Sequence, residues 1–109
     1  MADVLRFTVA ELLRDSLGAP ALAAQMFYLV GREHPSSVLA PKALLAAASI
    51  DAQNADSVYR VLLRDYSASP YTLAISGQMT ERYAVVEDSV RLLMDRARAV
   101  LEGLARRRP

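Results

Sequence analysis

The chain has no cysteine and no tryptophan, and its 109 residues include a single histidine, His34, and a single lysine, Lys42. Without cysteine it can form no disulfide, no thiolate metal site and no cysteine nucleophile. With one histidine it cannot build a multi-histidine zinc site by itself. Glycine and proline are also scarce, and no glycine-rich phosphate loop is present. We therefore expect no bound metal and no cofactor.

His34 is the only candidate for a general base. A catalytic histidine needs an orienting carboxylate and a nucleophile, and neither occurs here in a recognisable motif. The neighbouring carboxylates Glu87 and Asp88 are adjacent in sequence, so they cannot share one face of a helix. The sequence therefore predicts no catalytic residue, and a protein that is not an enzyme.

Apolar residues make up 53% of the chain, with alanine and leucine the commonest of them. This content argues against disorder, and the low glycine and proline content favours an all-α protein of one domain's length. The strong excess of arginine over lysine, together with the alanine content, is typical of a GC-rich bacterial genome.

The first residues carry charges at Asp3, Arg6 and Glu11, with no basic segment followed by an apolar run. This pattern predicts no signal peptide. The longest uncharged stretch, residues 16–31, is too short to span a bilayer. We expect a protein that is cytoplasmic or peripheral on a membrane surface.

Apolar residues recur every three or four positions, which predicts helices throughout. Gly18 should stop the first helix, and Pro35 disfavours helical geometry at the residue before it. Ser36 or Ser37 should cap the third helix, with Pro41 in its first turn. The first predicted helix spans residues 4–17, and the second starts at residue 20 and ends at 33 or 34. The third follows its serine cap and ends near residue 53, and the fourth, capped by Asn54 or Asp56, ends near residue 66. The last two span residues 70–76 and about 80–106.

The first predicted helix begins after Asp3, which should act as its cap. Its inward face is predicted to hold Leu5, Val9, Leu12 and Leu13.

The segment 26–37 is repeated 32 residues later as the segment 58–69. The matched pairs are Met26 and Val58, Phe27 and Tyr59, Leu29 and Val61, Val30 and Leu62, Arg32 and Arg64, and Ser37 and Ser69. A period of 30-odd residues that contains two helices is typical of a helical solenoid. The alternative is an alanine-rich helical bundle in which the repeat arises by chance.

The two repeats resemble the tetratricopeptide repeat family. The first reads "AELL" and then "MFYLVGREHPSSVLAPKAL", and the second reads "APKALLAAASI" and then "SVYRVLLRDYSASPYTLA". Ala23 corresponds to the small residue of the family's second helix, Phe27 to its aromatic residue and Pro35 to its closing proline. Ser67 replaces that proline in the second repeat, and the chain after Gly77 matches no repeat.

This resemblance implies a short right-handed solenoid of helical hairpins, used to bind other proteins and without catalytic activity. It predicts about two TPR-like repeats in residues 1–77, followed by a long amphipathic helix with a basic tail in residues 78–109. About three repeats are usually needed for stability. Either the final helix or a partner should therefore cover the open end.

The final helix carries an unbroken apolar stripe with spacings of three and four. Its members are Tyr83, Val86, Val90, Leu93, Ala97, Val100 and Leu104. Val85, Leu92, Met94 and Leu101 widen the stripe beyond what one neighbouring helix would need. The helix is expected either to fold back and cap the solenoid or to dock in part on another chain.

The tail is basic: residues 95–109 hold five arginines against Asp95 and Glu102. Such a tail can bind the phosphates of anionic lipid or nucleic acid. The plainer interpretation is a solvated helix end favoured by the helix dipole. Because no aromatic residues are interleaved with the arginines, nucleic acid is the less favoured partner.

These observations predict an accessory subunit that helps to assemble or stabilise a larger complex of other protein subunits. The alternative is a peripheral subunit of a membrane-embedded bacterial assembly, respiratory or photosynthetic, held through the C-terminal helix. A nucleic-acid-binding helical protein is less favoured. The predicted partner-binding residues are Leu92, Met94, Leu101, Arg106, Arg107 and Arg108.

Overall fold

The computed structural model describes residues 1–107, and within them the protein is all-α, with helices joined by short turns and no strand. In chain order the elements are α1 (Ala2–Asp15), α2 (Pro20–Glu33), α3 (Leu39–Ile50), the short 3₁₀ helix η1 (Ala52–Asn54), α4 (Ala55–Asp65), α5 (Pro70–Ile75) and α6 (Glu81–Arg106). The prediction of an all-α protein is confirmed.

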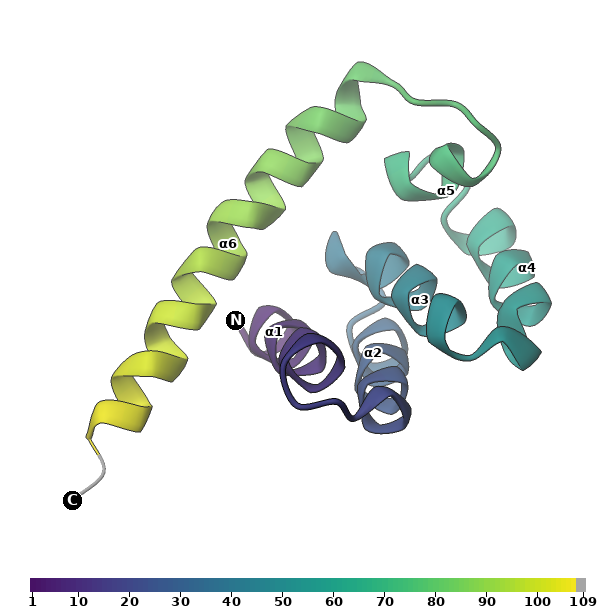
Figure 1. The fold of residues 1–109 in the computed structure, drawn as a ribbon. Coiled ribbons are helices and arrows are strands. Elements are labelled where there is room, and N and C mark those ends of the chain that lie inside the picture. The colour runs from purple at the N-terminus through teal and green to yellow at the C-terminus, as the bar shows by residue number, and fades with distance from the viewer. Residues whose placement is uncertain (108–109) are drawn as a thin grey trace.

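Helices α1 to α4 pack side by side in chain order, α5 packs against α3, and α6 runs back beside α1 and α5 (Figure 1). Helix α2 packs mainly against α1 and α3, and α3 packs against α2 and α4. The long helix α6 contacts α1 and α5, and an ion pair from Lys42 to Glu87 joins it to α3. Helix α6 therefore folds back onto the hairpins instead of projecting away from them.

The turn that follows α2 is repeated after α4. At both places the helix-ending residue donates its N–H to the carbonyl four residues earlier, and its own carbonyl accepts from a serine three residues later. The first set is Val30, His34 and Ser37, and the second is Leu62, Tyr66 and Ser69. Corresponding residues of the two sets are 32 residues apart, so the repeat in the sequence corresponds to a repeated helix–turn connection in the structure.

Several predicted helix ends are confirmed and others are wrong. Helix α2 ends before His34, as Pro35 requires. The N-cap of α3 is Val38 and not the predicted Ser36 or Ser37, although the Ser37 hydroxyl accepts a hydrogen bond from the Leu39 N–H. The predicted cap Asp3 instead lies inside α1, where its carboxylate accepts a 2.6 Å hydrogen bond from the Ser37 hydroxyl. Helix α3 ends at Ile50, because the next residues form η1.

The largest core cluster joins residues of α1, α2, α3 and α6. At its centre the rings of Phe7 and Phe27 meet edge to face with centroids 5.1 Å apart. The predicted inward face of α1 is wrong: Val4, Phe7, Thr8 and Ala10 are its buried residues. Of the predicted residues Leu12 is exposed and Leu5, Val9 and Leu13 are half-buried. The buried face differs from the predicted one because α1 lies between α2 and α6 and packs against both of them.

Helix α6 buries Val90, Met94 and Ala97, while Tyr83, Val86 and Leu93 are half-buried. The predicted stripe is thus confirmed up to Ala97, but its last members, Val100 and Leu104, are exposed. Val100 and Leu104 are exposed because α6, with 26 residues, extends beyond α1, which has 14 residues.

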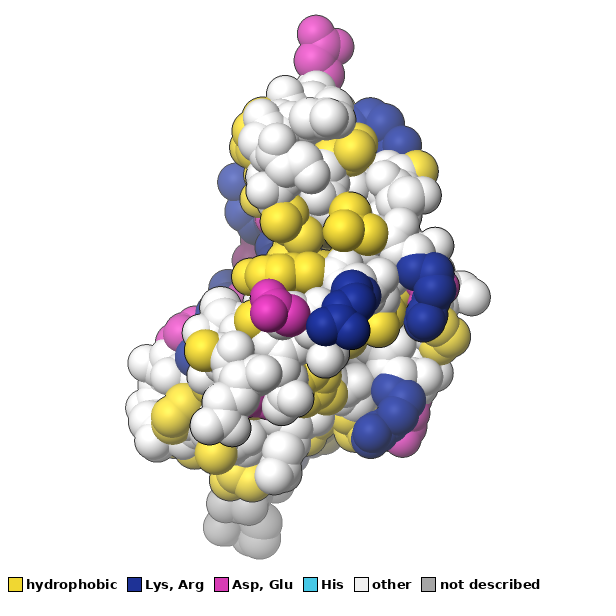
Figure 2. Space-filling view, turned by 90° about the vertical axis from the view of Figure 1, so that its right-hand side faces the viewer, with side chains coloured by type: hydrophobic (Ala, Val, Ile, Leu, Met, Phe, Trp, Pro, Cys, Tyr) yellow, Lys and Arg dark blue, Asp and Glu magenta, His cyan; other side chains and the backbone are white. Residues whose placement is uncertain are grey.

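The α4–α5 end of the molecule is covered by α6 only where α6 contacts α5. Leu63 and Ile75 are exposed there, and hydrophobic side chains lie among charged ones on this side of the molecule (Figure 2). Helix α6 therefore folds back without closing the α4–α5 end. Within residues 1–107, no helix combines the length and the apolar character needed to cross a bilayer.

Candidate protein-interaction surfaces

The region around His34 is built from salt-bridged surface residues. The His34 ring is half-buried at the end of α2, with its Nε2 atom 3.2 Å from the Arg6 guanidinium. Arg6 also forms an ion pair of 2.6 Å with Glu33. No cluster of three or more potential metal ligands occurs within the described residues.

A charged cluster holds α6 against α1 and α3. The Lys42 ammonium donates to both carboxylate oxygens of Glu87, at 2.8 and 2.9 Å, and lies 5.4 Å from the centroid of the Tyr71 ring. Arg98 pairs with Glu11 at 3.3 Å, and burial raises the pKa of the Glu11 carboxyl despite the positive charges around it. The cavity between these groups is about 210 Å³. Since each of these charges has an oppositely charged partner, we interpret the cluster as one that holds α6 in place.

Tyr71 lies at the edge of this cluster and is buried. Its hydroxyl has no hydrogen-bond partner among the described residues. Burial raises the pKa of this phenol well above its ordinary value, and the neighbouring Glu87 carboxylate raises it further through its negative charge and as a hydrogen-bond acceptor. The Glu87 carboxylate therefore lies near the buried hydroxyl without forming a hydrogen bond of good geometry, and such poor compensation usually costs free energy.

We expect Tyr71→Phe to raise the free energy of unfolding by roughly 1 kcal/mol, because it removes the poorly compensated hydroxyl and keeps the ring. Tyr66→Phe is the matched control, and it should lower the free energy of unfolding. The Tyr66 hydroxyl donates to the Pro35 carbonyl at 2.9 Å, so its removal should cost about 1 kcal/mol. Urea unfolding of both variants measures the difference, and a loss of stability in Tyr71→Phe would mean that the hydroxyl is satisfied.

The structure separates the partner-binding residues predicted on α6. Leu92 is 61% exposed and points away from the hairpins, whereas Met94 is buried and lies 3.6 Å from the Thr8 hydroxyl. Leu101 is half-buried. Met94 could therefore meet a partner only if α6 left α1.

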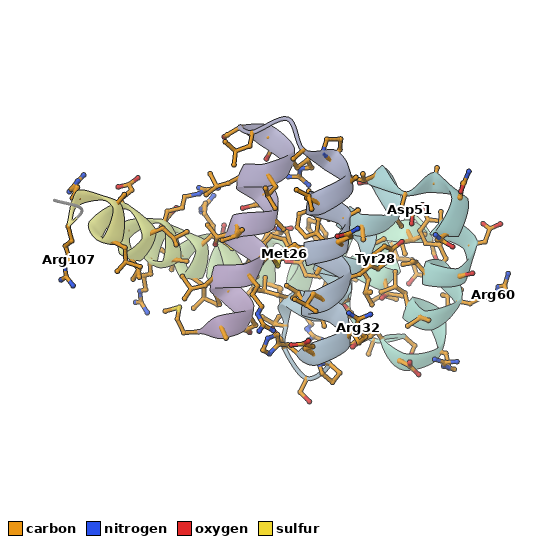
Figure 3. All side chains as sticks on the ribbon, turned by 90° about the horizontal axis from the view of Figure 1, so that it is seen from below. Met26, Tyr28, Arg32, Asp51, Arg60 and Arg107 are labelled. Carbon is orange, nitrogen blue, oxygen red and sulfur yellow. The ribbon has the colours of Figure 1, made fainter. Side chains whose placement is uncertain are left out.

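The basic tail lies at the far end of α6 (Figure 3). Arg106 is exposed, with its guanidinium 3.9 Å from the Glu102 carboxylate, and Arg107 is exposed at the helix end. Arg108 lies outside the described residues. A partner contact through this end stays a prediction.

A larger surface was missed by the sequence reasoning. It is an apolar groove of about 810 Å³ along α2, which we call the α2–α4 groove. Leu22, Met26 and Leu29 line it from α2, and Val61 and Tyr66 line it from the α4 side. Figure 3 shows Met26, Tyr28 and Arg32 on α2, with α4 beside it.

The sequence does contain a signal for this groove. Helix α2 has one apolar stripe through Ala23, Phe27 and Val30, which is buried, and a second through Leu22, Met26 and Leu29. A helix that packs against the core on one face needs only one such stripe. The second stripe therefore indicates an additional apolar surface.

Comparison of the chain with protein-family models, with curated proteins and with solved structures found no match.

Proposed function

We propose that the protein is a non-catalytic interaction subunit, a TPR-like scaffold that helps to assemble or stabilise a larger protein complex. The observation that carries this proposal is the unsupported end of α6. The helix continues from Ala97, its last buried residue, to Arg106, a distance of about 14 Å. Over this length Val100 is 44% exposed and Leu104 is 57% exposed.

An apolar helix end of this kind gains little from local propensity, because most helical stability in proteins comes from tertiary packing. A second protein that covered Val100 and Leu104 would supply this packing. Arg106 and Arg107 follow directly and favour an acidic region on that protein. A membrane-embedded bacterial assembly with anionic lipid around it has the same complementary chemistry and is the second candidate.

We expect the triple variant Arg106→Gln, Arg107→Gln and Arg108→Gln to weaken assembly with the partner complex and to flatten its dependence on salt. Exposed charges act over about 10 Å at 0.1 M salt, so rising ionic strength should reproduce the effect in the unmodified chain. The measurement is co-purification from the native source across a salt series. The folding of the isolated variant should barely change, since these arginines follow the last apolar contact of α6.

The control replaces three exposed arginines elsewhere, Arg60, Arg64 and Arg82, by glutamine, which changes the net charge equally. If neither the tail variant nor salt changes assembly, the arginines form a solvated helix end and do not contact the partner. Equal weakening by the control would mean that only net charge matters. A photo-crosslinking residue at Leu104, compared with one at the exposed Gln53, identifies the protein that covers this end.

A further inference from the structure

We propose that copies of this chain associate head to tail, with the outward face of α6 from one copy lying in the α2–α4 groove of the next. This goes beyond the proposed function, which concerns the end of α6 and a different protein. The proposal rests on the shape and charge of two uncovered surfaces on the same molecule.

The α2–α4 groove is long enough for two or three turns of helix. It continues past its main part into a smaller hollow of about 260 Å³, because both are lined by Tyr28, Leu44 and Val61. Helix α4, which forms one wall, has 11 residues and is therefore about 16 Å long. The bond from Tyr66 to the Pro35 carbonyl joins the two walls at one end.

The groove has one cation without a partner. Asp65, which lines the groove, is bound by Arg64 at 2.9 Å, and Glu33 beside the groove is bound by Arg6. Arg32 also lines the groove and has no ion pair within residues 1–107. An occupant with apolar side chains and a carboxylate near one end would therefore complement the groove.

The outward face of α6 has this chemistry. Acidic and apolar residues alternate along it with spacings of four and three. They are Glu81, Val85, Asp88, Leu92, Asp95, Ala99 and Glu102, and all of them are exposed. Arg106 continues this face beyond Glu102, with which it forms an ion pair, and Arg91 and Arg96 flank it. The ion pairs of Asp88 and Asp95 with arginines of α6 itself are exposed and hence weak.

The two surfaces also agree in length. Val85 and Leu92 are two helical turns apart, or about 10 Å, so both fit within the groove at once. Asp88 lies between them and Asp95 lies one turn beyond Leu92, so a carboxylate is available to pair with Arg32 in either direction of the helix.

The positions of these surfaces determine the symmetry. Lys42 of α3 points to α6, whereas Leu44 of the same helix lines the groove. Two residues along a helix are about 200° apart, so the groove and α6 lie on opposite faces. Two copies cannot exchange such surfaces around a two-fold axis, and each dimer keeps one free groove and one free α6. The assembly is heterologous and extends into a chain or closes into a ring.

Sedimentation equilibrium over a concentration series from about 1 µM to about 1 mM tests the proposal with the unmodified full chain. The average mass should rise with concentration beyond that of a dimer. A groove variant, Leu22→Gln with Arg32→Glu, and an α6 variant, Val85→Gln with Leu92→Gln, should each lower the apparent association constant at least about tenfold. All four positions are exposed, so both variants should fold, as circular dichroism can verify.

Mixing the two variants gives the decisive result. The groove variant keeps an intact α6 and the α6 variant keeps an intact groove, so the mixture should form a dimer of one copy of each and stop there. Leu63→Gln is the matched control, since Leu63 is 58% exposed and belongs to neither surface. If a double variant does not fold, the single changes Arg32→Glu and Leu92→Gln replace it.

Four results would overturn the proposal. An unmodified chain that stays monomeric at about 1 mM would assign the groove to another protein. Association that stops at a dimer, or a mixture of variants that stays monomeric, would exclude the head-to-tail contact. Loss of association in Leu63→Gln would place the contact at the α4–α5 end instead.

Discussion

Phe27→Ala is expected to lower the free energy of unfolding by about 3–5 kcal/mol, the range for large aromatic truncations in a core. Phe27 is fully buried and lies in the cluster that joins α1, α2, α3 and α6. Its ring packs edge to face with Phe7, and the Arg14 guanidinium lies 5.4 Å from its centroid. Truncation removes these contacts together and leaves a cavity between four helices that cannot easily close.

Urea unfolding at low protein concentration measures this loss. Leu22→Ala is the control on the same helix, because Leu22 is 56% exposed and its removal should change stability by about 0.5 kcal/mol or less. A loss below about 1 kcal/mol for Phe27→Ala would mean that Phe27 is not at the centre of the fold, which would also remove the basis for matching it to the aromatic position of the repeat.

The turns of this fold could be predicted from the sequence because single residues determine them. Pro35 ends α2, Pro70 starts α5 with the Ser69 hydroxyl accepting from the Tyr71 N–H, and Gly18 adopts a positive φ of 59° after α1. These are local effects of ring closure, capping and the missing side chain, so they do not depend on what packs nearby.

The buried face of α1 could not be predicted in the same way. Leucines and valines occur around much of this helix, so periodicity alone does not select one face. The choice is made by α6, which comes from the other end of the chain and places Met94 against Thr8. The prediction of Asp3 as a helix cap is wrong for a related reason, since its hydrogen bond to Ser37 joins two segments 34 residues apart.

The same distinction applies to the candidate surfaces: their local features could be predicted from the sequence, and the features set by helix packing could not. The apolar stripe of α6 could be predicted, because a heptad pattern is local, and so could the uncovered Leu92. The burial of Met94 and the presence of the α2–α4 groove could not, because both depend on how far one helix lies from another. Gly31 illustrates this: a Cβ atom there would lie 2.6 Å from a side-chain carbon of Leu44, so the close approach of α2 and α3 depends on this glycine.

Helix α6 is part of the main core rather than an addition to it. The cluster around Phe27 includes Val90, Met94 and Ala97 of α6 together with residues of three hairpin helices. The hairpins α1 to α5 would therefore expose Phe7 and its neighbours if α6 left them. We infer that the hairpins and α6 unfold as one cooperative unit.

Val90→Asp tests this inference and is expected to cost about 3–4 kcal/mol, because it places a carboxylate without a partner in an apolar interface. Val85→Asp is the matched control on the exposed face of α6, with an expected change of about 0.5 kcal/mol or less at low protein concentration. Hydrogen exchange separates two ways in which Val90→Asp could act. If α6 and the hairpins are one unit, exchange should accelerate in α1, α2 and α3 as much as in α6. Acceleration confined to α6, with the hairpins still protected, would show that they are stable alone and that α6 is a detachable helix.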